Sequence, residues 1–311
     1  MRKGFFYATK TKTNNKMYYN ENTIIWNNRE FLKASEAKTD LYGQTLHYGY
    51  GAFEGIRSYE TSGGAKIFKA REHYERLKRS CELIHIPFEY SVQELEEISY
   101  EVLERNNLKD AYLRPLVYCD PNMSLNKPAK VNLMICAWQW GSYLGNKLLR
   151  VCISSYQRPN PKSVKVEAKA CGHYVNSILA TAEAKEKGFD EGLLLDMNGN
   201  IAEGPGANFF CEKGGKLFTP PLGNILPGIT RATVLEICDE LKIPYEVRHL
   251  HPTELLSMDG AFFCGTAAEI IGIESVNDVP FRELWSETLG ARIQKYYSVL
   301  VREKKHKQEF V

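Results

Sequence analysis

Residues 166–174 have the sequence VEAKACGHY, which places a lysine between a predicted strand and a predicted helix. The alternation of apolar and polar residues over 164–168 predicts a strand that ends just before Lys169. A helix is predicted over 174–187, and it ends at Gly188, a residue type that commonly terminates helices. Most lysines are solvated surface groups, so a chemical role for Lys169 depends on which other groups accompany it.

Three further segments supply groups that such a lysine could use. Residues 201–208, IAEGPGAN, place Glu203 beside a turn rich in glycine and proline. Residues 226–231, LPGITR, open a helix whose free backbone N–H groups favour an anion, and 265–269, GTAAE, form a second small-residue turn. A lysine for a Schiff base, a carboxylate for a pyridine nitrogen and two N–H-rich turns for a phosphate and a substrate carboxylate together predict a pyridoxal phosphate (PLP) site.

The rest of the chain predicts strands with helices interspersed but no regular β-α-β alternation, which favours an α+β fold. In the first half, strands are predicted over 23–26, 50–59, 66–69, 111–118 and 131–138, and helices over 72–84 and from Ser91 to Asn106. In the second half, strands are predicted over 148–154, 192–196, 208–212 and 261–264, and helices from Pro227 and over 289–300.

Domain organisation follows from the length and from a change in composition. The 311 residues are enough for two domains at about 100–200 residues each. The composition changes at residues 140–146, WGSYLGN, so we predict a linker over 140–147. The expected parts are an N-terminal extension (1–20), a smaller N-terminal domain (21–139) and a larger C-terminal PLP-binding domain (148–311).

Composition and charge exclude several classes of function. The formal net charge is only +2, so no basic excess favours a nucleic-acid partner. The apolar runs are shorter than the roughly 20 residues that span a bilayer, and the basic, polar N-terminus lacks the apolar stretch of a secretory signal. The eight cysteines are scattered without a C-x-x-C pair. We therefore expect reduced thiols and a cytoplasmic protein without a membrane or nucleic-acid partner.

Other motifs are considered and set aside. The glycines of 49–55, GYGAFEG, resemble a dinucleotide fingerprint, but their spacing has one residue too many and no helix follows directly. His249 and His251 lack a nearby carboxylate or thiol that would complete a metal set, so a structural role is expected for both and no metal is predicted.

Eight motifs in order along the chain resemble those of the branched-chain amino acid aminotransferases, a family of fold-type IV PLP enzymes. The resemblance extends from about Thr23 to Val301, and it implies a two-domain fold like that of D-amino acid aminotransferase, with PLP in the interdomain cleft. Cys171 and His173 stand where the family more often has glycine and asparagine. The motifs are 46–57 (LHYGYGAFEGIR), 71–77 (REHYERL), 112–116 (YLRPL), 138–145 (WQWGSYLG), 167–174 (EAKACGHY), 201–204 (IAEG), 226–231 (LPGITR) and 265–269 (GTAAE).

The resemblance implies roles toward the cofactor. Lys169 would form the Schiff base with PLP and move a proton between the substrate Cα and the cofactor C4′. Glu203 would pair with the pyridine nitrogen, and Tyr174 would hydrogen-bond the phenolic oxygen. The groups implied for the phosphate are Arg76, Gly228, Ile229, Thr230 and Thr266.

The resemblance also implies a substrate pocket. The backbone of Thr266 and Ala267, with the Tyr112 hydroxyl, would bind the α-carboxylate. A branched aliphatic side chain has no polar group, so an apolar cavity must select it, and one methylene there discriminates by only about 1–3 kcal/mol. Leucine, isoleucine and valine should therefore all be accepted. The residues assigned to the substrate from their motifs are Tyr48, Phe53, Gly55, Arg57, Trp140, Tyr143 and Tyr174.

Two further predictions concern the same pocket. Glutamate and 2-oxoglutarate, the partners in the second half-reaction, carry an additional carboxylate, so the pocket must contain a cation. Alternation along its strand places Arg114 on the same face as Tyr112, and we predict that it is this cation; the alternative is an ion pair at the domain interface. The turn-rich loop 120–128 should reach a neighbouring subunit, with Met123 and Leu125 near the substrate.

The expected activity is reversible, PLP-dependent amino transfer between L-leucine, L-isoleucine or L-valine and 2-oxoglutarate, in a homodimer or larger homo-oligomer with shared active sites. Two alternatives share the fold, namely a D-amino acid or (R)-amine aminotransferase and an aminodeoxychorismate lyase. A third alternative is a non-catalytic protein that only binds PLP, against which the pair of Lys169 and Glu203 argues.

Overall fold

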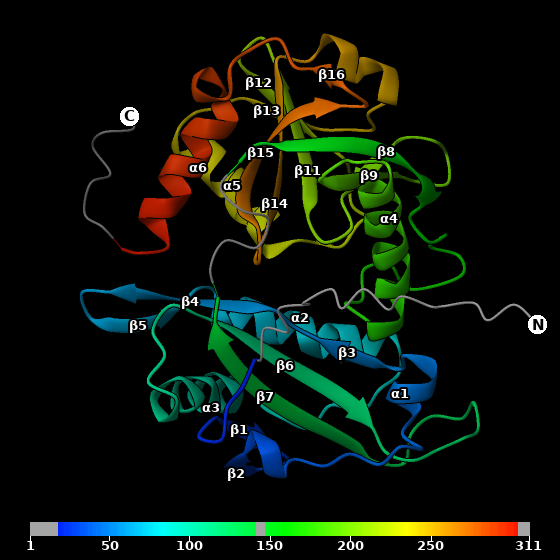
Figure 1. Cartoon of the computed structure of the whole chain (residues 1–311), viewed down its shortest axis with the longest axis vertical. Coiled ribbons are helices and arrows are strands. Elements are labelled where there is room, and N and C mark those ends of the chain that lie inside the picture. The colour runs from blue at the N-terminus through cyan, green and yellow to red at the C-terminus, as the bar shows by residue number, and fades with distance from the viewer. Residues whose placement is uncertain (1–17, 141–146, 304–311) are drawn as a thin grey trace, which may run out of the picture.

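Two β-sheets organise the chain, one built from residues 24–139 and the other from residues 149–280. The computed structural model describes residues 18–140 and 147–303, so most of the predicted linker lies outside it. The two sheets are stacked along the longest axis of the molecule, and the helix α4 (Tyr174–Glu186) extends from the second toward the first (Figure 1). The site described below lies where the two parts meet.

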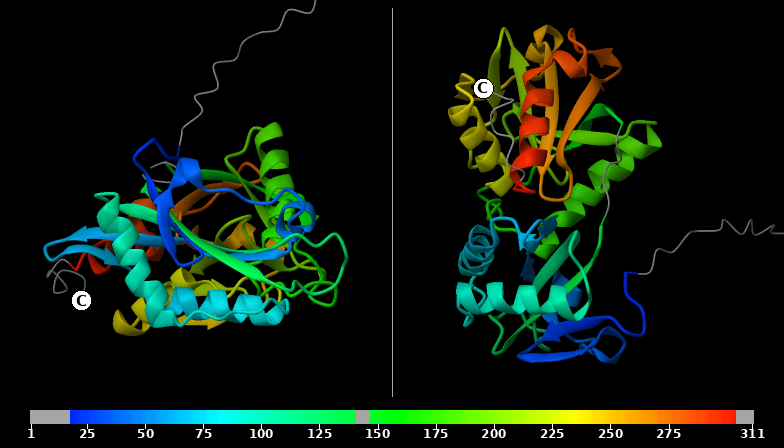
Figure 2. Two further views of the ribbon diagram at one scale, coloured as in Figure 1. Left: turned by 90° about the horizontal axis from the view of Figure 1, so that it is seen from below. Right: turned by 90° about the vertical axis from the view of Figure 1, so that its left-hand side faces the viewer.

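The N-terminal sheet has seven strands in the order β2-β1-β7-β6-β4-β5, with β3 paired to β6. Two helices, α2 (Ala70–Leu83) and α3 (Val92–Arg105), lie side by side on it (Figure 2). Their apolar faces bury Tyr74, Leu77 and Leu95 in one core with the sheet. The other elements are β1 (Ile24–Asn27), β2 (Glu30–Lys33), α1 (Gln44–Tyr48), β3 (Gly51–Phe53), β4 (Ile56–Thr61), β5 (Gly64–Ile67), β6 (Ala111–Cys119) and β7 (Val131–Gln139).

The C-terminal sheet is a mixed sheet of nine strands in the order β10-β9-β8-β15-β14-β11-β12-β13, with β16 paired to β15. The strands are β8 (Leu149–Gln157), β9 (Glu191–Leu195), β10 (Ile201–Glu203), β11 (Asn208–Lys213), β12 (Lys216–Thr219), β13 (Tyr245–Val247), β14 (Gly260–Gly265), β15 (Glu269–Val276) and β16 (Val279–Pro280). The remaining helices are α5 (Ile229–Glu240) and α6 (Leu289–Leu300).

Consecutive phenylalanines explain why both faces of this sheet are covered. Side chains alternate between the two faces of a strand, so neighbouring residues enter different cores. Phe210 and Phe262 stack at 5.0 Å in the core that contains α5 and α6. Phe209 and Phe263 belong to a second core, with Leu149 and other residues of β8 and β9.

Most predicted helices and strands are confirmed within two or three residues. Ser91 caps α3, since its hydroxyl accepts a hydrogen bond from the Glu94 backbone N–H at 3.1 Å, and Asn106 ends the helix. The single strand predicted over 50–59 is two strands, β3 and β4, because Glu54 and Gly55 interrupt the strand between them. The short β10 and the long β15 were not predicted from the sequence.

The predicted strand over 164–168 is wrong. This segment is a series of tight turns, in which the N–H of Val164 donates to the carbonyl of Asn160 and that of Ala168 to Lys165. The prolines at 159 and 161 cannot donate ladder hydrogen bonds, and the apolar residues Val166 and Ala168 are buried without a neighbouring strand. Lys169 therefore lies on a loop.

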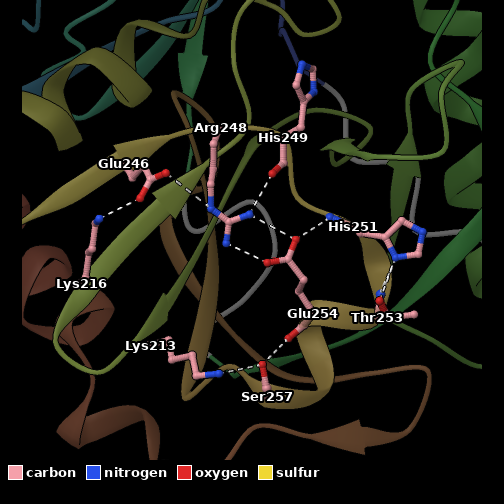
Figure 3. A network of polar contacts seen from close by, with 9 residues as sticks. All are labelled: Lys213, Lys216, Glu246, Arg248, His249, His251, Thr253, Glu254 and Ser257. Atoms are coloured by element: carbon pink, nitrogen blue, oxygen red, sulfur yellow. Dashed lines mark hydrogen bonds and ion pairs between the residues drawn. The ribbon is translucent and has the colours of Figure 1, made fainter.

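The two histidines that were set aside lie in a polar surface network on the C-terminal part (Figure 3). The ring of His251 accepts a hydrogen bond from Thr253 N and caps the short 3-10 helix Pro252–Ser257, while Arg248 binds Glu254 through two nitrogens at 3.1 and 2.7 Å. This confirms a structural role for His251. No helix among the described residues is long and apolar enough to cross a membrane.

Candidate active site

A cavity of about 570 Å³ lies between the two sheets, and residues from both line it. The larger part of the sequence-predicted site meets in this cavity, although its members come from many separate elements. The predicted residues that line it are Phe53, Gly55, Arg76, Tyr112, Arg114, Trp140, Lys169, Tyr174, Glu203, Gly228, Ile229, Thr230, Thr266 and Ala267.

Backbone contacts with the N-terminal part hold the Lys169 loop in place. The N–H of Lys169 donates to Ser80 Oγ at 3.0 Å, and its carbonyl accepts from Phe53 N at 3.1 Å. The Lys169 ammonium then donates to the Tyr174 hydroxyl at 2.7 Å, and the rings of Phe53 and Tyr174 lie 5.1 and 5.2 Å from it. The amine is thus oriented into the cavity, and no carboxylate of the described residues pairs with it.

Glu203 ends β10 and is almost completely buried. Its carboxylate accepts hydrogen bonds from Leu226 N at 3.1 Å and from Asn208 Nδ2 at 3.0 Å, and Arg158 Nε lies 3.0 Å from the same oxygen that Leu226 binds. Burial raises the pKa of Glu203, while Arg158 opposes that rise. Because a carboxylate has about four acceptor sites, these contacts leave capacity for one more donor from the cavity.

Arg76 is fixed from behind by a fully buried carboxylate. Its Nε and Nη2 donate to the two oxygens of Glu54 at 2.7 and 2.9 Å, and its Nη1 donates to the Pro227 carbonyl at 3.0 Å. His73 Nδ1 donates to Glu54 at 2.8 Å. Burial alone would raise the pKa of Glu54, but Arg76 and His73 hold it well below its usual range. Three of the five Arg76 N–H groups are used, so two remain for a ligand.

The same end of the cavity contains the start of α5. Gly228 precedes its first turn, whose N–H groups at Ile229 and Thr230 have no acceptor inside the helix and favour an anion. A Cβ at residue 228 would come within 1.9 Å of Asn208 Oδ1. Only glycine fits there, and Asn208 can therefore hold both Glu203 and the Leu226 carbonyl.

A second group of cavity residues, here called the aromatic end, comprises Phe53, Tyr112, Arg114 and Trp140. Tyr112 packs so closely on Gly55 that a Cβ at residue 55 would lie 1.8 Å from its hydroxyl oxygen. The Arg114 guanidinium lies over the rings of Phe53, Tyr112 and Trp138, at 4.7, 5.6 and 5.9 Å. Its Nε is buried without a hydrogen-bond partner among the described residues. The alternative for Arg114, an ion pair at the domain interface, has no carboxylate partner among the described residues.

Some predicted residues lie elsewhere. Arg57 lines a neighbouring cavity, where it pairs with Glu269 at 2.9 Å and donates to the Trp140 carbonyl at 3.1 Å. Tyr48 donates to the carbonyl of Met123 at 3.1 Å on the surface, outside the central cavity. Leu125 is 90% exposed in the same loop. Tyr143 lies outside the described residues.

Sequence reasoning missed the residues that support the predicted ones. Arg158 and Asn208 hold Glu203, and Glu54 with His73 holds Arg76. Glu54 lies inside a recognised motif, and a carboxylate between Phe53 and Gly55 in an otherwise apolar segment was a usable signal. No local signal marks Arg158, because its partner lies 45 positions away.

The two unusual residues beside Lys169 face different groups. Cys171 lines the cavity, and burial raises its pKa to about 11, so the thiol stays protonated at neutral pH. His173 donates from Nδ1 to the Ala168 carbonyl at 3.2 Å, and burial lowers its pKa. Both therefore act as neutral packing groups next to the lysine.

The geometry fits PLP. A free amine, a buried carboxylate with spare acceptor capacity and an anion-binding end face one cavity. The backbone is also closely packed at Gly265, where a Cβ would lie 3.2 Å from the Gly206 carbonyl oxygen, a tight contact. Among the described residues no group of three or more His, Cys, Asp or Glu side chains could hold a metal ion.

Comparisons with known proteins agree with this geometry. Residues 51–276 match the family model described as Amino-transferase class IV. The chain is 39% identical over 281 residues to the branched-chain-amino-acid aminotransferase of Escherichia coli (strain K12), covering 88% of this chain and 91% of that protein.

Solved structures give the same result. The branched-chain aminotransferase of Thermoproteus uzoniensis with norvaline superposes with a TM-score of 0.88 at 34% identity, covering 93% of this chain and 97% of that one. The branched-chain amino acid aminotransferase of Thermobaculum terrenum in its PLP form gives a TM-score of 0.86 at 31% identity, covering 91% of this chain and 95% of that one.

Proposed function

The chain belongs to the class IV amino-transferase family, and on that premise we propose that it transfers the amino group of L-leucine, L-isoleucine or L-valine to 2-oxoglutarate with PLP as its cofactor. It is a branched-chain-amino-acid aminotransferase of fold type IV. The observation that carries the proposal is the cavity in which the Lys169 amine, the Glu203 carboxylate and the aromatic surround of Arg114 face one another.

Lys169 and Glu203 carry the chemistry. When bound, PLP supplies an electron sink for the charge that develops at the substrate Cα. The Lys169 amine binds the cofactor covalently and then moves the proton between the substrate Cα and the cofactor C4′. Its hydrogen bond to Tyr174, at 2.7 Å, orients the amine and places the tyrosine hydroxyl beside it, where it can also bind the phenolic oxygen of the cofactor.

Glu203 holds a proton at the pyridine nitrogen. Its carboxylate is buried, but Arg158 and two N–H donors stabilise the negative charge that this task requires. Arg76, the first turn of α5 and Thr266 bind the phosphate, since each offers N–H or O–H donors at one end of the cavity. The cofactor is thereby held at both ends while Lys169 acts between them.

The aromatic end binds the substrate. The backbone of Thr266 and Ala267 and the hydroxyl of Tyr112 bind the α-carboxylate. Phe53, Tyr174 and Trp140 supply the apolar wall for a branched side chain. Arg114 binds the γ-carboxylate of glutamate or 2-oxoglutarate, and with leucine bound its charge is stabilised by three aromatic faces.

A substrate panel tests this function. The purified holoenzyme is assayed with 2-oxoglutarate and with L- and D-amino acids and primary amines, with glutamate formation as the readout. Activity confined to L-leucine, L-isoleucine and L-valine supports the proposal. Activity with D-amino acids or (R)-amines would favour the other aminotransferases of this fold. A cofactor absorbance that no amino donor changes would indicate a protein that only binds PLP.

The assembly is a second part of the proposal. A set of apolar side chains is exposed on α1 and the segment just before it, on the loop 120–128 and on one face of α4, and these elements lie side by side (Figures 1 and 2). Exposed apolar patches commonly mark protein interfaces. The set is Leu41, Tyr42, Leu46, Tyr48, Met123, Leu125, Val175, Ile178 and Leu179. We assign this α1–α4 face to a second copy of the chain, whose loop would approach the neighbouring cavity.

We also propose a domain boundary within 140–147 and a cytoplasmic location for the protein. The two sheets share no strand among the described residues, which supports a boundary within 140–147. All eight cysteines are free thiols, which supports a cytoplasmic location.

Sedimentation of the holoenzyme tests the proposed interface. Leu125→Asp should shift the protein toward monomers and lower its activity, whereas Leu284→Asp, at another exposed leucine (70% against 90% for Leu125) that lies outside this face, should do neither. A monomeric, fully active wild-type enzyme would contradict the shared-site proposal.

A further inference from the structure

The segment that leads into β1 places a tyrosine against two tryptophans, of which Trp140 lines the cavity and Trp138 lies behind it. The ring of Tyr18 stacks on Trp140 with centroids 6.3 Å apart and planes 17° apart, and it meets Trp138 edge-on at 5.4 Å. Tyr18 lies in the part of the chain that the family motifs do not cover. The resemblance to the family therefore does not account for the position of Tyr18.

Hydrogen bonds hold this segment in place. The backbone of Ile24, the first residue of β1, is bound on both sides by the Asn106 side chain, at 2.9 and 2.8 Å. The turn before it is closed by Asn20 N, which donates to the Thr23 hydroxyl at 3.0 Å. The chain is thus tied to α3 and bent just before β1, which brings the Tyr18 ring onto the tryptophans.

The same two tryptophans support the substrate end of the cavity from behind. Tyr112 lies 5.3 Å from Trp138 and 5.2 Å from Trp140, and the two indoles lie 5.5 Å apart. Tyr112 is directly opposite Trp138 in the β6–β7 pair. Trp138 Nε1 is buried with no hydrogen-bond partner in the described part of the chain, so ring contacts, not a hydrogen bond, position this indole.

We propose that Tyr18 is a positioning residue for the substrate pocket, because it holds the indoles of Trp138 and Trp140 against Tyr112. The four rings connect the N-terminal segment to the hydroxyl that, under the proposed function, binds the α-carboxylate. Arg114, which lies over Trp138, is supported by the same rings. The ring contacts found among the described residues lead from Tyr18 to Tyr112 and not to Lys169 or Glu203, so we expect Tyr18 to act on substrate binding more than on the binding of PLP.

Kinetics of the full-length holoenzyme test this role. Tyr18→Ala should raise KM for L-leucine and for 2-oxoglutarate by about three- to tenfold, the range expected when aromatic contacts are lost. The kcat should change less than about twofold, and the Kd of PLP should stay at the wild-type value. Tyr18→Phe keeps the ring and should restore the wild-type KM. Tyr19→Ala is the matched control and should leave KM unchanged, because the adjacent Tyr19 is exposed to a similar degree (52% against 56% for Tyr18) but the ring contacts to Trp138 and Trp140 come from Tyr18.

A measurement that needs no turnover separates this inference from the proposed function. Coupled indole and phenol rings give near-ultraviolet circular dichroism, and Tyr18→Ala should change that spectrum while Tyr19→Ala should not. If the wild-type protein fails to transfer amino groups, the proposed function is wrong whatever the spectrum shows. The role of Tyr18 is overturned if Tyr18→Ala leaves the spectrum or KM unchanged, if Tyr19→Ala has the same effect, or if kcat or the Kd of PLP changes instead of KM.

A double-mutant cycle tests whether Tyr18 acts through the indoles. Trp138→Phe alone and with Tyr18→Ala is compared for KM. Residues in contact give non-additive effects, so the double variant should lose less than the product of the two single losses. Full additivity would mean that Tyr18 does not act through Trp138.

Discussion

Two of the three arginines that line the cavity, Arg76 and Arg114, differ in how their charges are balanced. Arg76 is bound by both oxygens of Glu54 and by the Pro227 carbonyl. Arg114 lies among three aromatic rings, and its Nε has no hydrogen-bond partner among the described residues. The charge of Arg76 is therefore balanced by a carboxylate before any ligand binds, whereas the charge of Arg114 at the aromatic end is supported by ring faces.

This difference matches the two kinds of ligand. A cofactor is the same in every turnover, so fixed donors around its phosphate and its ring nitrogen cost nothing in versatility. The substrates alternate between an aliphatic side chain and a carboxylate. An arginine that is stabilised by ring faces can serve both, because the rings accept an apolar neighbour and leave the N–H groups available for a carboxylate.

The largest loss of activity is expected at Lys169, which acts between the cofactor-binding residues and the aromatic end. Lys169→Ala should lower kcat by more than about 10⁴-fold, because both the covalent amine and the proton carrier are lost. The visible absorbance of covalently bound cofactor should disappear, while circular dichroism shows an intact fold. Lys165→Ala, an exposed lysine in the same loop, is the control. A borohydride-reducible adduct at wild-type level in the Lys169 variant would show that another lysine is used.

A smaller loss of activity is expected at Glu203, which we assign to the ring nitrogen of the cofactor. Glu203→Gln should leave PLP bound but lower kcat by about 10²- to 10³-fold, since a neutral amide no longer favours a proton on the pyridine nitrogen. Glu191→Gln, a buried carboxylate on the neighbouring strand β9, controls for general destabilisation. An unchanged kcat in the Glu203 variant would contradict its assigned role.

Loss of the ion pair between Glu54 and Arg76 should lower the stability of the fold. Glu54→Gln breaks a buried ion pair, a change that typically costs about 3–5 kcal/mol, so the variant should melt several degrees lower and bind PLP more weakly. The melting temperatures of both proteins are compared from pH 7 to pH 3.

The pH dependence has a defined sign. The pKa of Glu54 is lowered in the fold, so its stabilisation is present above its ordinary value of 4.5 and is lost as the pH falls below it. Burial lowers the pKa of His73 as well, which adds a loss below its ordinary value of 6.5. The wild-type protein should lose stability more steeply than Glu54→Gln below pH 4.5. Parallel curves would show that Glu54 does not carry this charge.

The predicted site residues that the structure brings into one cavity are those encoded in short motifs. Lys169, Glu203 and the two anion-binding turns each carry local composition that marks them, and the cavity brings them together. The supporting contacts depend on packing between distant segments. Glu54 meets His73 and Arg76 because α2 packs on the sheet, and Arg158 meets Glu203 across a gap of 45 residues.

The errors in the fold have equally local reasons. Alternation at 164–168 arises from side chains buried in successive turns, and alternation alone does not distinguish this from a strand. Arg57 was assigned to the substrate because it lies in a motif with Phe53, yet its side chain faces Glu269 in a neighbouring cavity. The position of Tyr48 and Leu125 on the surface agrees with a pocket completed by a second subunit, which a single sequence cannot place.

The most direct test asks whether Arg114 serves the carboxylate substrate and not the aliphatic one. The two half-reactions of Arg114→Met are followed separately by single-turnover absorbance of the bound cofactor. The reaction with L-glutamate should slow by about 10- to 100-fold, the value of a charged hydrogen-bonded pair, and the reaction with L-leucine by less than about threefold. Equal losses with both amino acids would show that Arg114 is structural, and that the aromatic end does not distinguish the two substrates as we describe.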